Sequence, residues 1–149
     1  MLLNQTAEYA FRAMAFLASR HLTGEGRITA KQLSEATNIP TYYLSKVMRR
    51  LVVADLVDGL RGHRGGFKLA REPDQILFAE VLKAIDYQSE VGRCAFGIGK
   101  CDGTDPCLLH ASWSKLLDDF ETWATTHSLM HAAEIPQMPT RPTGAATDQ

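Results

Sequence analysis

The sequence predicts a mainly α fold: a winged helix-turn-helix with a small two-stranded β wing, followed by a long dimerisation helix. Three observations carry this prediction. Two short amphipathic segments with a tight turn between them lie within residues 29–53, a basic glycine-rich hairpin follows them, and an apolar rhythm of helical period runs over residues 109–123. With 149 residues and 45% hydrophobic content, the chain suits one compact domain, or a small domain with a helical appendage.

A first helix is expected near the start of the chain. Asn4 or Thr6 is a suitable N-cap, because a short polar side chain can accept a hydrogen bond from a free backbone N–H of the first turn. Apolar residues then recur at helical spacing, which predicts that one face of this helix is buried. These residues are Ala10, Phe11, Met14, Leu17 and Ala18.

The next two helices predict a helix-turn-helix. Thr29 stands three residues before Gln32, which is the spacing of a capping box, and opens a short helix with Leu33 and Ala36 facing inward. Asn38 suits the turn that ends it, because asparagine tolerates left-handed backbone angles. Pro40 is acceptable at the start of the following helix, where the first turn has no internal use for an amide hydrogen.

The second of these helices has the character of a recognition helix. At about 100° per residue, one side is apolar, with Leu44, Val47, Met48 and Leu51. The candidate DNA-binding residues of this helix are Thr41, Tyr42, Tyr43, Ser45, Lys46, Arg49 and Arg50. Cations and hydroxyls of this kind provide phosphate contacts and hydrogen bonds to base edges in a major groove. An ordinary solvated helix face is the alternative.

The following hairpin favours the DNA-binding interpretation. Residues 56–60 and 67–69 are predicted strands, and the tip between them carries Arg61, His63 and Arg64 among glycines. Charge is also divided along the chain: residues 1–70 hold ten Lys and Arg against five Asp and Glu, whereas the remainder holds six against twelve. The net charge of −1 therefore conceals a basic half suited to double-stranded DNA.

The three cysteines of the chain lie in one short segment with a histidine. Cys94, Cys101, Cys107 and His110 fall among several glycines, which allow a loop to fold tightly around a small centre. Thiolates suit zinc and iron-sulfur centres, and an imidazole can complete four-coordination. A coincidence of buried hydrophobic cysteines is the bland alternative, and an odd cysteine count without a signal peptide argues against disulfides.

Two alternatives use the same residues differently. A structural zinc ion would leave the same spacing and would give a regulator without a redox response. A thiol oxidoreductase using Cys107 with His110 is a further alternative, but the chain has no CxxC pair, no phosphate-binding glycine loop and no βαβ pattern. The chain is therefore not expected to be an enzyme.

A helix beyond the cysteines is expected to form a homodimer. Its apolar residues recur at spacings of four, three, four and three, as in a helix that packs against another helix. They are Leu109, Trp113, Leu116, Phe120 and Trp123. An intramolecular core helix is the alternative, but symmetric operators favour a dimer with two recognition helices.

The segment YYLSKVMRRLVVADLVDGLRGHRGGFKL, with the AEYAFRAM opening and the cysteine loop, resembles the Rrf-type family of transcriptional regulators, which includes iron-sulfur regulators of the IscR and NsrR kind. The resemblance covers the chain from residue 1 to about 134. It implies a winged helix-turn-helix with a dimerisation helix, and an iron-sulfur cluster, either 2Fe-2S or 4Fe-4S, that controls operator binding. It also implies that the three cysteines are the cluster thiolates.

The fourth ligand has two candidates within this resemblance. His110 lies two residues beyond the last cysteine, as in the IscR-like branch, whereas Glu8 lies where the nitric-oxide-sensing branch has a carboxylate given by the partner subunit. Without a metal, Glu8 would simply favour the dipole at the start of its helix. The resemblance leaves the signal open between redox state, nitric oxide and iron-sulfur status.

These expectations divide the chain into three regions. Residues 1–70 form the winged helix-turn-helix, residues 71–134 hold a helix, the cysteine loop and the dimerisation helix, and residues 135–149 form a disordered tail rich in proline and small residues. No apolar run is long enough to span a membrane, so a cytoplasmic protein without a membrane partner is expected.

Overall fold

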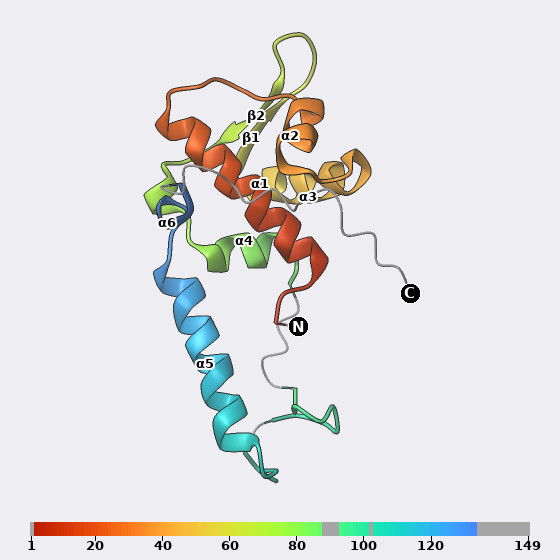
Figure 1. The fold of residues 1–149 in the computed structure, drawn as a ribbon, viewed down its shortest axis with the longest axis vertical. Helices are drawn as coiled ribbons and strands as arrows, with labels where there is room; N and C mark the ends of the chain where they lie inside the picture. Colours follow the sequence, from red (N-terminus) through yellow and green to blue (C-terminus); the bar gives the residue numbers. More distant parts are fainter. Residues whose placement is uncertain (1, 88–92, 102, 134–149) are drawn as a thin grey trace, which may run out of the picture.

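The computed structural model describes residues 2–87, 93–101 and 103–133 (Figure 1). In chain order, its elements are α1 (Gln5–Leu22), α2 (Ala30–Thr37), α3 (Thr41–Val53), β1 (Val57–Leu60), β2 (Gly66–Leu69), a 3-10 turn (Pro73–Gln75), α4 (Phe78–Ala84), α5 (His110–Thr126) and α6 (Met130–Ala133). The predicted fold class is confirmed: helices dominate, and the described strands form one antiparallel pair. None of the described helices is long and apolar enough to cross a membrane. The predicted tail lies outside the described residues.

Helix α1 forms the centre of the core. Its N-cap is Asn4, whose side chain accepts a hydrogen bond of 2.9 Å from the Ala7 amide. The apolar face expected from the sequence is buried, with Met14 and Ala18 fully enclosed. This face packs against α2, α3, α4, α6 and β2, so α1 joins the upper and lower parts of the molecule in Figure 1.

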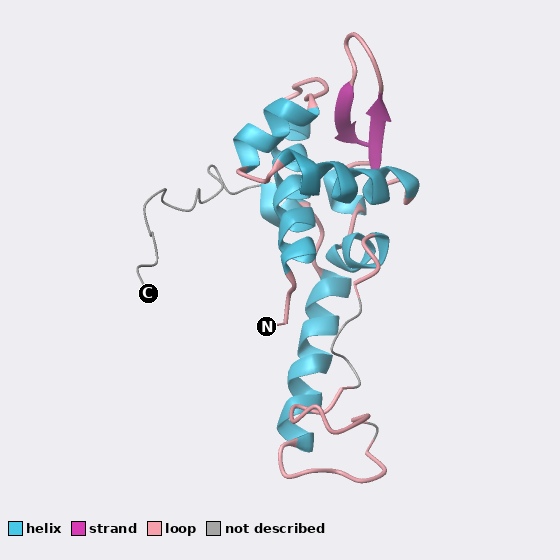
Figure 2. Cartoon of the chain, turned by 90° about the vertical axis from the view of Figure 1, so that its right-hand side faces the viewer, coloured by secondary structure: helices cyan, strands magenta, loops and turns pink. Residues whose placement is uncertain are grey.

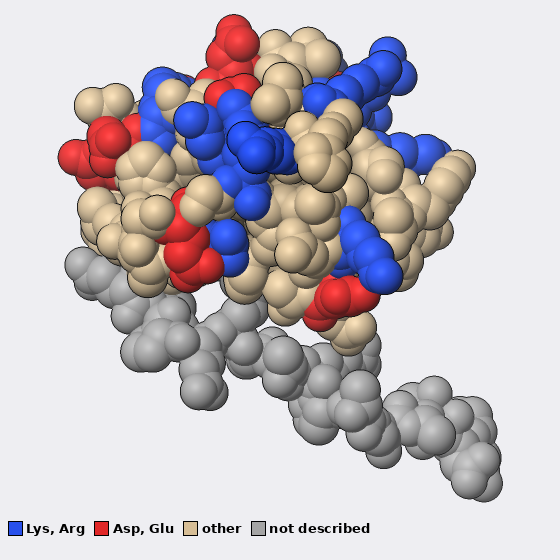
Figure 3. Space-filling view, turned by 90° about the horizontal axis from the view of Figure 1, so that it is seen from above, with Lys and Arg blue, Asp and Glu red and all other residues tan. Residues whose placement is uncertain are grey.

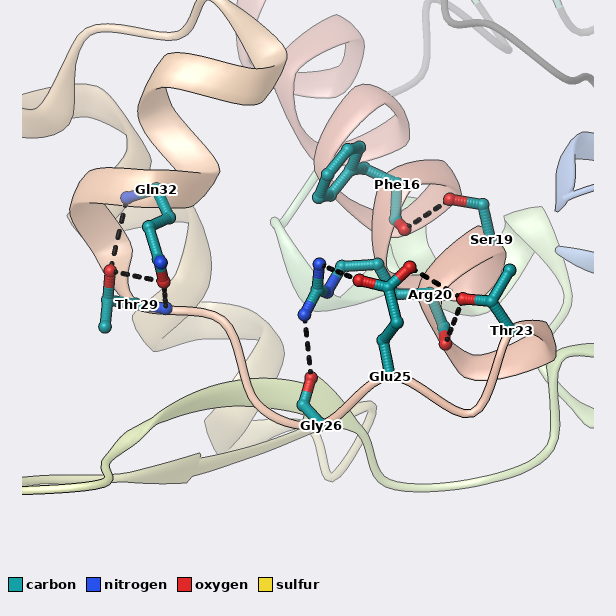
Figure 4. Close-up of polar contacts among 8 residues, drawn as sticks. All are labelled: Phe16, Ser19, Arg20, Thr23, Glu25, Gly26, Thr29 and Gln32. Atoms are coloured by element: carbon teal, nitrogen blue, oxygen red, sulfur yellow. Dashed lines mark hydrogen bonds and ion pairs between the residues drawn. The ribbon is translucent and has the colours of Figure 1, made fainter.

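The connector after α1 is held by short polar contacts (Figure 4). Arg20 binds both the Glu25 carboxylate and the Gly26 carbonyl, and then Thr29 and Gln32 form the predicted capping box of α2. Asn38 ends α2 in a left-handed conformation at φ 53°, as expected. One detail of the prediction is wrong: Ala36 is only half-buried, and the enclosed residue is Thr37, whose hydroxyl donates to a carbonyl of the preceding turn.

The wing is a two-stranded sheet extended by one bridging residue from before α2. β1 and β2 pair from Val57 opposite Leu69 to Leu60 opposite Gly66. Ile28, before α2, adds a bridge that the sequence did not predict: its N–H donates to the Phe67 carbonyl at 3.0 Å and its carbonyl accepts from the Phe67 N–H at 2.8 Å. The wing is therefore tied directly to the start of the helix-turn-helix.

This close approach requires glycine at position 66. Gly66 has φ +128°, and a Cβ there would lie 2.4 Å from the Ile28 carbonyl oxygen. We expect Gly66→Ala to lower the free energy of unfolding by roughly 2–4 kcal/mol, because it adds backbone strain and a clash with main chain that cannot move away. Urea unfolding measures this decrease.

Gly62→Ala is the matched control for that substitution. Gly62 has φ +90°, but nothing lies within 4 Å of a Cβ placed on it. It therefore shares the unfavourable backbone angle and lacks the clash. Equal decreases in the two variants would show that the Ile28 bridge contributes nothing to the requirement for glycine.

The lower part of the molecule is built on α4 and α5. Helix α5 projects away from the body, and its free end carries the cysteine loop (Figures 1 and 2). Its other end is anchored by aromatic rings: Trp123 stacks on Phe78 of α4 with centroids 5.0 Å apart, and Phe78 meets Phe11 of α1 at 4.9 Å. The helix expected between the wing and the cysteine loop corresponds to α4.

Candidate functional site

Helix α3 presents the polar face that the sequence predicts for a recognition helix. Its apolar residues Leu44, Val47, Met48 and Leu51 are buried. Tyr42 and Tyr43 are 66% and 48% exposed, and the Lys46 ammonium lies 4.3 Å from the centre of the Tyr42 ring. This cation–π contact fixes a positive charge beside an aromatic face on the outside of the helix.

Two neighbouring arginines of α3 have different roles in the structure. Arg49 is exposed, and the described residues offer its guanidinium no hydrogen bond or ion pair. Arg50 instead donates a hydrogen bond to the backbone carbonyl of Ile85, at the end of α4. We therefore separate them: Arg49 is available to a ligand, whereas Arg50 joins α3 to α4. The sequence pattern, which places both on one face, could not make this distinction.

The hydroxyls near the start of α3 are partly engaged. Thr41 donates to the Ser34 hydroxyl at 3.2 Å, and Ser45 donates to the Thr41 carbonyl at 2.9 Å. Both side chains are exposed, so each hydroxyl keeps its lone pairs and can exchange these local bonds for contacts with DNA.

The wing tip carries the other predicted cations. Arg61, His63 and Arg64 are exposed and make no hydrogen bond or ion pair within the described part of the chain. Figure 3, which looks onto the wing end of the molecule, shows a group of Lys and Arg side chains with Asp and Glu groups around it. A basic tip beside α3 is the arrangement by which a winged helix contacts two adjacent stretches of DNA backbone.

The base of the wing is held by an ion pair between Arg27 and Asp58. The guanidinium contacts the Asp58 carboxylate at 2.6 Å and the Asp58 carbonyl at 2.9 Å. The hydrogen bond from Arg27 lowers the pKa of the Asp58 carboxyl, with a further contribution from Lys68. This pair aligns β1 with the segment before α2.

A pH dependence follows from this lowered pKa. The carboxylate contributes stability above its unfolded pKa, near 4, and the contribution disappears as the pH falls through the lower folded value. We expect Asp58→Asn to be less stable than the wild type at neutral pH, and the difference to shrink as the pH falls below about 4. Thermal unfolding over this range measures it; a constant difference would contradict the assignment.

The cysteine loop begins as a small hairpin. Arg93 and Lys100 form an antiparallel bridge, and the Cys94 amide donates to the Gly99 carbonyl at 3.1 Å. Gly97 and Gly99 have φ of 71° and 139°, which are conformations that side chains disfavour. The loop is fastened to α5 by Trp113, whose indole N–H donates to the Arg93 carbonyl at 2.8 Å. Sequence reasoning, which assigns Trp113 to the dimerisation stripe, misses this anchoring role.

The four predicted ligands come together as two donor pairs. Cys94 Sγ lies 3.9 Å from Cys107 Sγ, and Cys101 Sγ lies 3.0 Å from His110 Nδ1. All four side chains are half-buried. Among the described residues, no three His, Cys, Asp or Glu side chains form a single metal-binding group. The structure therefore brings the ligands together two by two.

The donor set fits an iron-sulfur cluster. The backbone amide of Phe96 lowers the pKa of the Cys94 thiol most strongly; desolvation opposes it, and the Cys107 thiol and then the amides of Ile98 and Gly97 lower the pKa further. Peptide N–H groups directed at a sulfur stabilise thiolate and tune clusters bound through it. Three thiols and an imidazole, in a loop with amides facing sulfur, satisfy these requirements.

Glu8, the rival fourth ligand, lies elsewhere. It is a half-buried residue in the first turn of α1, where a carboxylate complements the helix dipole. No hydrogen bond or ion pair in the described structure connects it with either donor pair. Within one chain, therefore, the cysteines are accompanied by His110 and not by Glu8.

The predicted dimerisation stripe divides in two. Trp123 and Phe120 pack inside the chain, where Phe120 faces Trp123 at 5.9 Å and Tyr87 at 6.5 Å between centroids. Leu109 and Leu116 are 44% and 45% exposed, and Trp113 is half-buried against the loop. The first half of the helix thus leaves apolar surface uncovered, whereas the second half serves the core.

Comparison with known proteins identifies transcriptional regulators that match most of the chain. The model of the family Rrf2, described as "Iron-dependent Transcriptional regulator", matches residues 3–134. The HTH-type transcriptional regulator IscR of Photorhabdus laumondii is 34% identical over 129 residues, which are 87% of this chain and 77% of IscR.

Solved structures share the fold. CymR of B. subtilis, the global cysteine regulator of that organism, superposes with a TM-score of 0.73 at 22% identity, covering 89% of this chain and 96% of CymR. IscR of T. potens superposes with a TM-score of 0.67 at 24% identity, covering 95% and 94%. These likenesses bear on the fold alone, since the identities are low.

Proposed function

Because this chain belongs to the Rrf2 family of transcriptional regulators, we propose that it binds its operator as a homodimer and that an iron-sulfur cluster controls this binding. The cluster ligands are Cys94, Cys101, Cys107 and His110. The two donor pairs at the free end of α5 are the observation that carries the proposal. The relatives are transcriptional regulators, and no enzymatic activity is proposed for this chain.

DNA is bound by the winged helix-turn-helix of residues 1–70. The exposed side chains of Tyr42, Lys46 and Arg49 on α3 enter the major groove, and the wing tip contacts the backbone beside it. Arg50, which is also exposed, supports this surface through its hydrogen bond to the carbonyl at the end of α4. Residues 71–134 hold the cluster and respond to its presence. The two regions differ in role but do not form separate folding units, because α1 packs against elements of both.

The homodimer is supported by apolar surface at the free end of α5. Five large side chains are exposed on the cysteine loop and the adjoining turns of the helix: Phe96, Ile98, Leu108, Leu109 and Leu116. Such surface is costly on a lone chain and typical of a dimer interface. A second copy covering it would also shield the cluster from water.

A continuous set of contacts links the cluster loop with the recognition helix. Trp113 fastens the loop to α5, and Trp123 at the other end of α5 stacks on Phe78 of α4. The end of α4 then accepts the hydrogen bond from Arg50 of α3. Gain or loss of the cluster changes how α5 is anchored, and hence shifts the two recognition helices of the dimer between arrangements of different operator affinity.

The test is the composition of the protein purified without oxygen. We expect a brown protein whose visible spectrum accompanies iron and acid-labile sulfide. A colourless protein with stoichiometric zinc would show that the site is a structural zinc site and not a cluster. A protein that stays free of metal after reconstitution with iron and sulfide would overturn the proposal. Glu8→Ala and His110→Ala, treated identically, identify the fourth ligand: we expect only His110→Ala to alter the spectrum.

A further inference from the structure

An open hollow of about 870 Å³ lies between the outer side of α3 and the end of α4. Its charged lining comes from both helices: Lys46, Arg49 and Arg50 from α3, and Glu80 and Lys83 from α4. Four cations therefore surround one space, although they belong to segments that are far apart in the sequence. The helical periodicity of α3 shows three of them, and only the folded chain brings the fourth to the same place.

The carboxylate in the hollow does not cancel this positive charge. Glu80 pairs with Arg71 at 2.7 Å and accepts a hydrogen bond from the Leu77 amide at 3.0 Å. Lys83, in contrast, is exposed, and within the described part of the chain its ammonium has no hydrogen bond or ion pair. The hollow keeps an excess of positive charge, so an anion is the ligand that it suits.

Arg50 fixes the two sides of the hollow relative to each other. Its guanidinium donates a hydrogen bond to the Ile85 carbonyl, directly beyond the end of α4. Because this acceptor is neutral, Arg50 also keeps its full positive charge there. Lys83 lies two residues before the bonded carbonyl, so the same hydrogen bond holds the α4 cation beside Lys46 and Arg49 of α3.

Helix α3 has the wing on one side and α4 on the other (Figure 1). When a recognition helix occupies a major groove, which is about 12 Å wide, the two sugar-phosphate backbones that border the groove run along the flanks of the helix. The basic wing tip faces the backbone on its own side. The backbone on the other side passes the hollow, where Lys83 is the cation farthest from the wing.

We propose that Lys83 of α4 binds a phosphate of the operator backbone, so that the DNA-binding surface extends beyond residues 1–70 into the region that holds the cysteine loop. This proposal rests on the proposed function, in which α3 enters the major groove. The contact adds affinity but reads no sequence, because a phosphate carries no base information. It also places a DNA contact on the helix whose Phe78 stacks on Trp123 of α5.

The salt dependence of operator binding tests this contact, using protein purified without oxygen and a duplex that the wild type selects from a random-sequence library. Lys83→Ala should lower the slope of log affinity against log salt by about 1.8, which is about 0.9 for each protomer of a homodimer. The same two contacts correspond to a loss of affinity of roughly thirtyfold at about 0.15 M salt.

Lys83→Arg is the matched control, because it keeps the charge and should keep the wild-type slope. Lys83 also stands in the last turn of α4, where a cation complements the helix dipole, but that role alone affects unfolding and not the salt slope. A wild-type slope in Lys83→Ala, or an equal decrease in Lys83→Arg, would overturn the proposal.

Removal of the charge from single phosphates locates the contact on the DNA. Methylphosphonate substitution should weaken wild-type binding at a phosphate beside each half-site and should have no effect at that phosphate in Lys83→Ala. The same set of sensitive phosphates in both proteins would also overturn the proposal. A wild-type protein that binds no duplex would instead contradict the proposed function, which keeps the two failures distinct.

Discussion

Replacing Arg61 and Arg64 together by alanine is expected to weaken operator binding on the order of a hundredfold to a thousandfold at physiological salt. The double variant removes four exposed cations from a homodimer. Each DNA phosphate that these cations no longer neutralise keeps its counterions, and the favourable free energy of releasing those counterions on binding is lost. The slope of log affinity against log salt should fall by about 0.9 for each phosphate concerned. Fluorescence anisotropy across a salt series, on a duplex selected by the protein from a random-sequence library, measures both quantities.

Lys115→Ala is the control for charge. Lys115 is exposed on α5, far from the wing, and pairs with Asp119 at 2.6 Å. It should leave the salt slope unchanged. If the double wing variant kept the wild-type affinity and salt slope, the wing tip would not be part of the DNA-binding surface.

Replacing Cys107 by alanine is expected to abolish the response of operator binding to the cluster. Cys107 is one of the four proposed cluster ligands and begins the turn into α5, where its carbonyl accepts a hydrogen bond from the His110 amide. Its loss removes the cluster, so the variant should bind the operator with the affinity of the metal-free wild type whether or not iron and sulfide are supplied. A coupling free energy of about 1–3 kcal/mol corresponds to a difference of roughly 5–150-fold in operator affinity between the cluster-loaded and the metal-free wild type. The variant should not show this difference.

Ser112→Ala is the comparison for this substitution. Ser112 lies on the same turn of α5 as His110 and is exposed, and within the described residues its hydroxyl donates to the Leu109 carbonyl. It should keep both the cluster and the difference in affinity. If Cys107→Ala retained the wild-type response, the cysteine loop would not be the sensor.

The helix-turn-helix was predictable because its signals are local. The capping box at Thr29 and the left-handed residue at Asn38 each depend on a few neighbouring residues, and both are confirmed. The bridge from Ile28 to Phe67 could not be predicted, because it joins residues far apart in sequence and a single residue of strand leaves no alternation to detect. The glycine at position 66 is recognisable from the sequence only as part of a turn, since its contact with the Ile28 carbonyl depends on that bridge.

The candidate site was predictable as a set of residue types but not as pairs. Spacing along the chain places Cys107 nearest to His110, yet the folded loop puts Cys94 beside Cys107 and Cys101 beside His110. Likewise, the helical periodicity places Arg49 and Arg50 on the same polar side of α3. Their roles differ only because α4 lies where Arg50 can donate a hydrogen bond to the carbonyl at its end. In both cases long-range packing decides which neighbour a side chain meets.

Operator affinity with and without the cluster is the most direct test of the central claim. Duplexes are first selected from a random-sequence library, separately with cluster-loaded and metal-free wild-type protein, and both forms are then titrated against both duplexes without oxygen. We predict that the two forms differ by at least about fivefold on one of the duplexes, as expected for a coupling of about 1 kcal/mol or more. Equal affinities of the loaded and metal-free forms on every duplex would contradict the account.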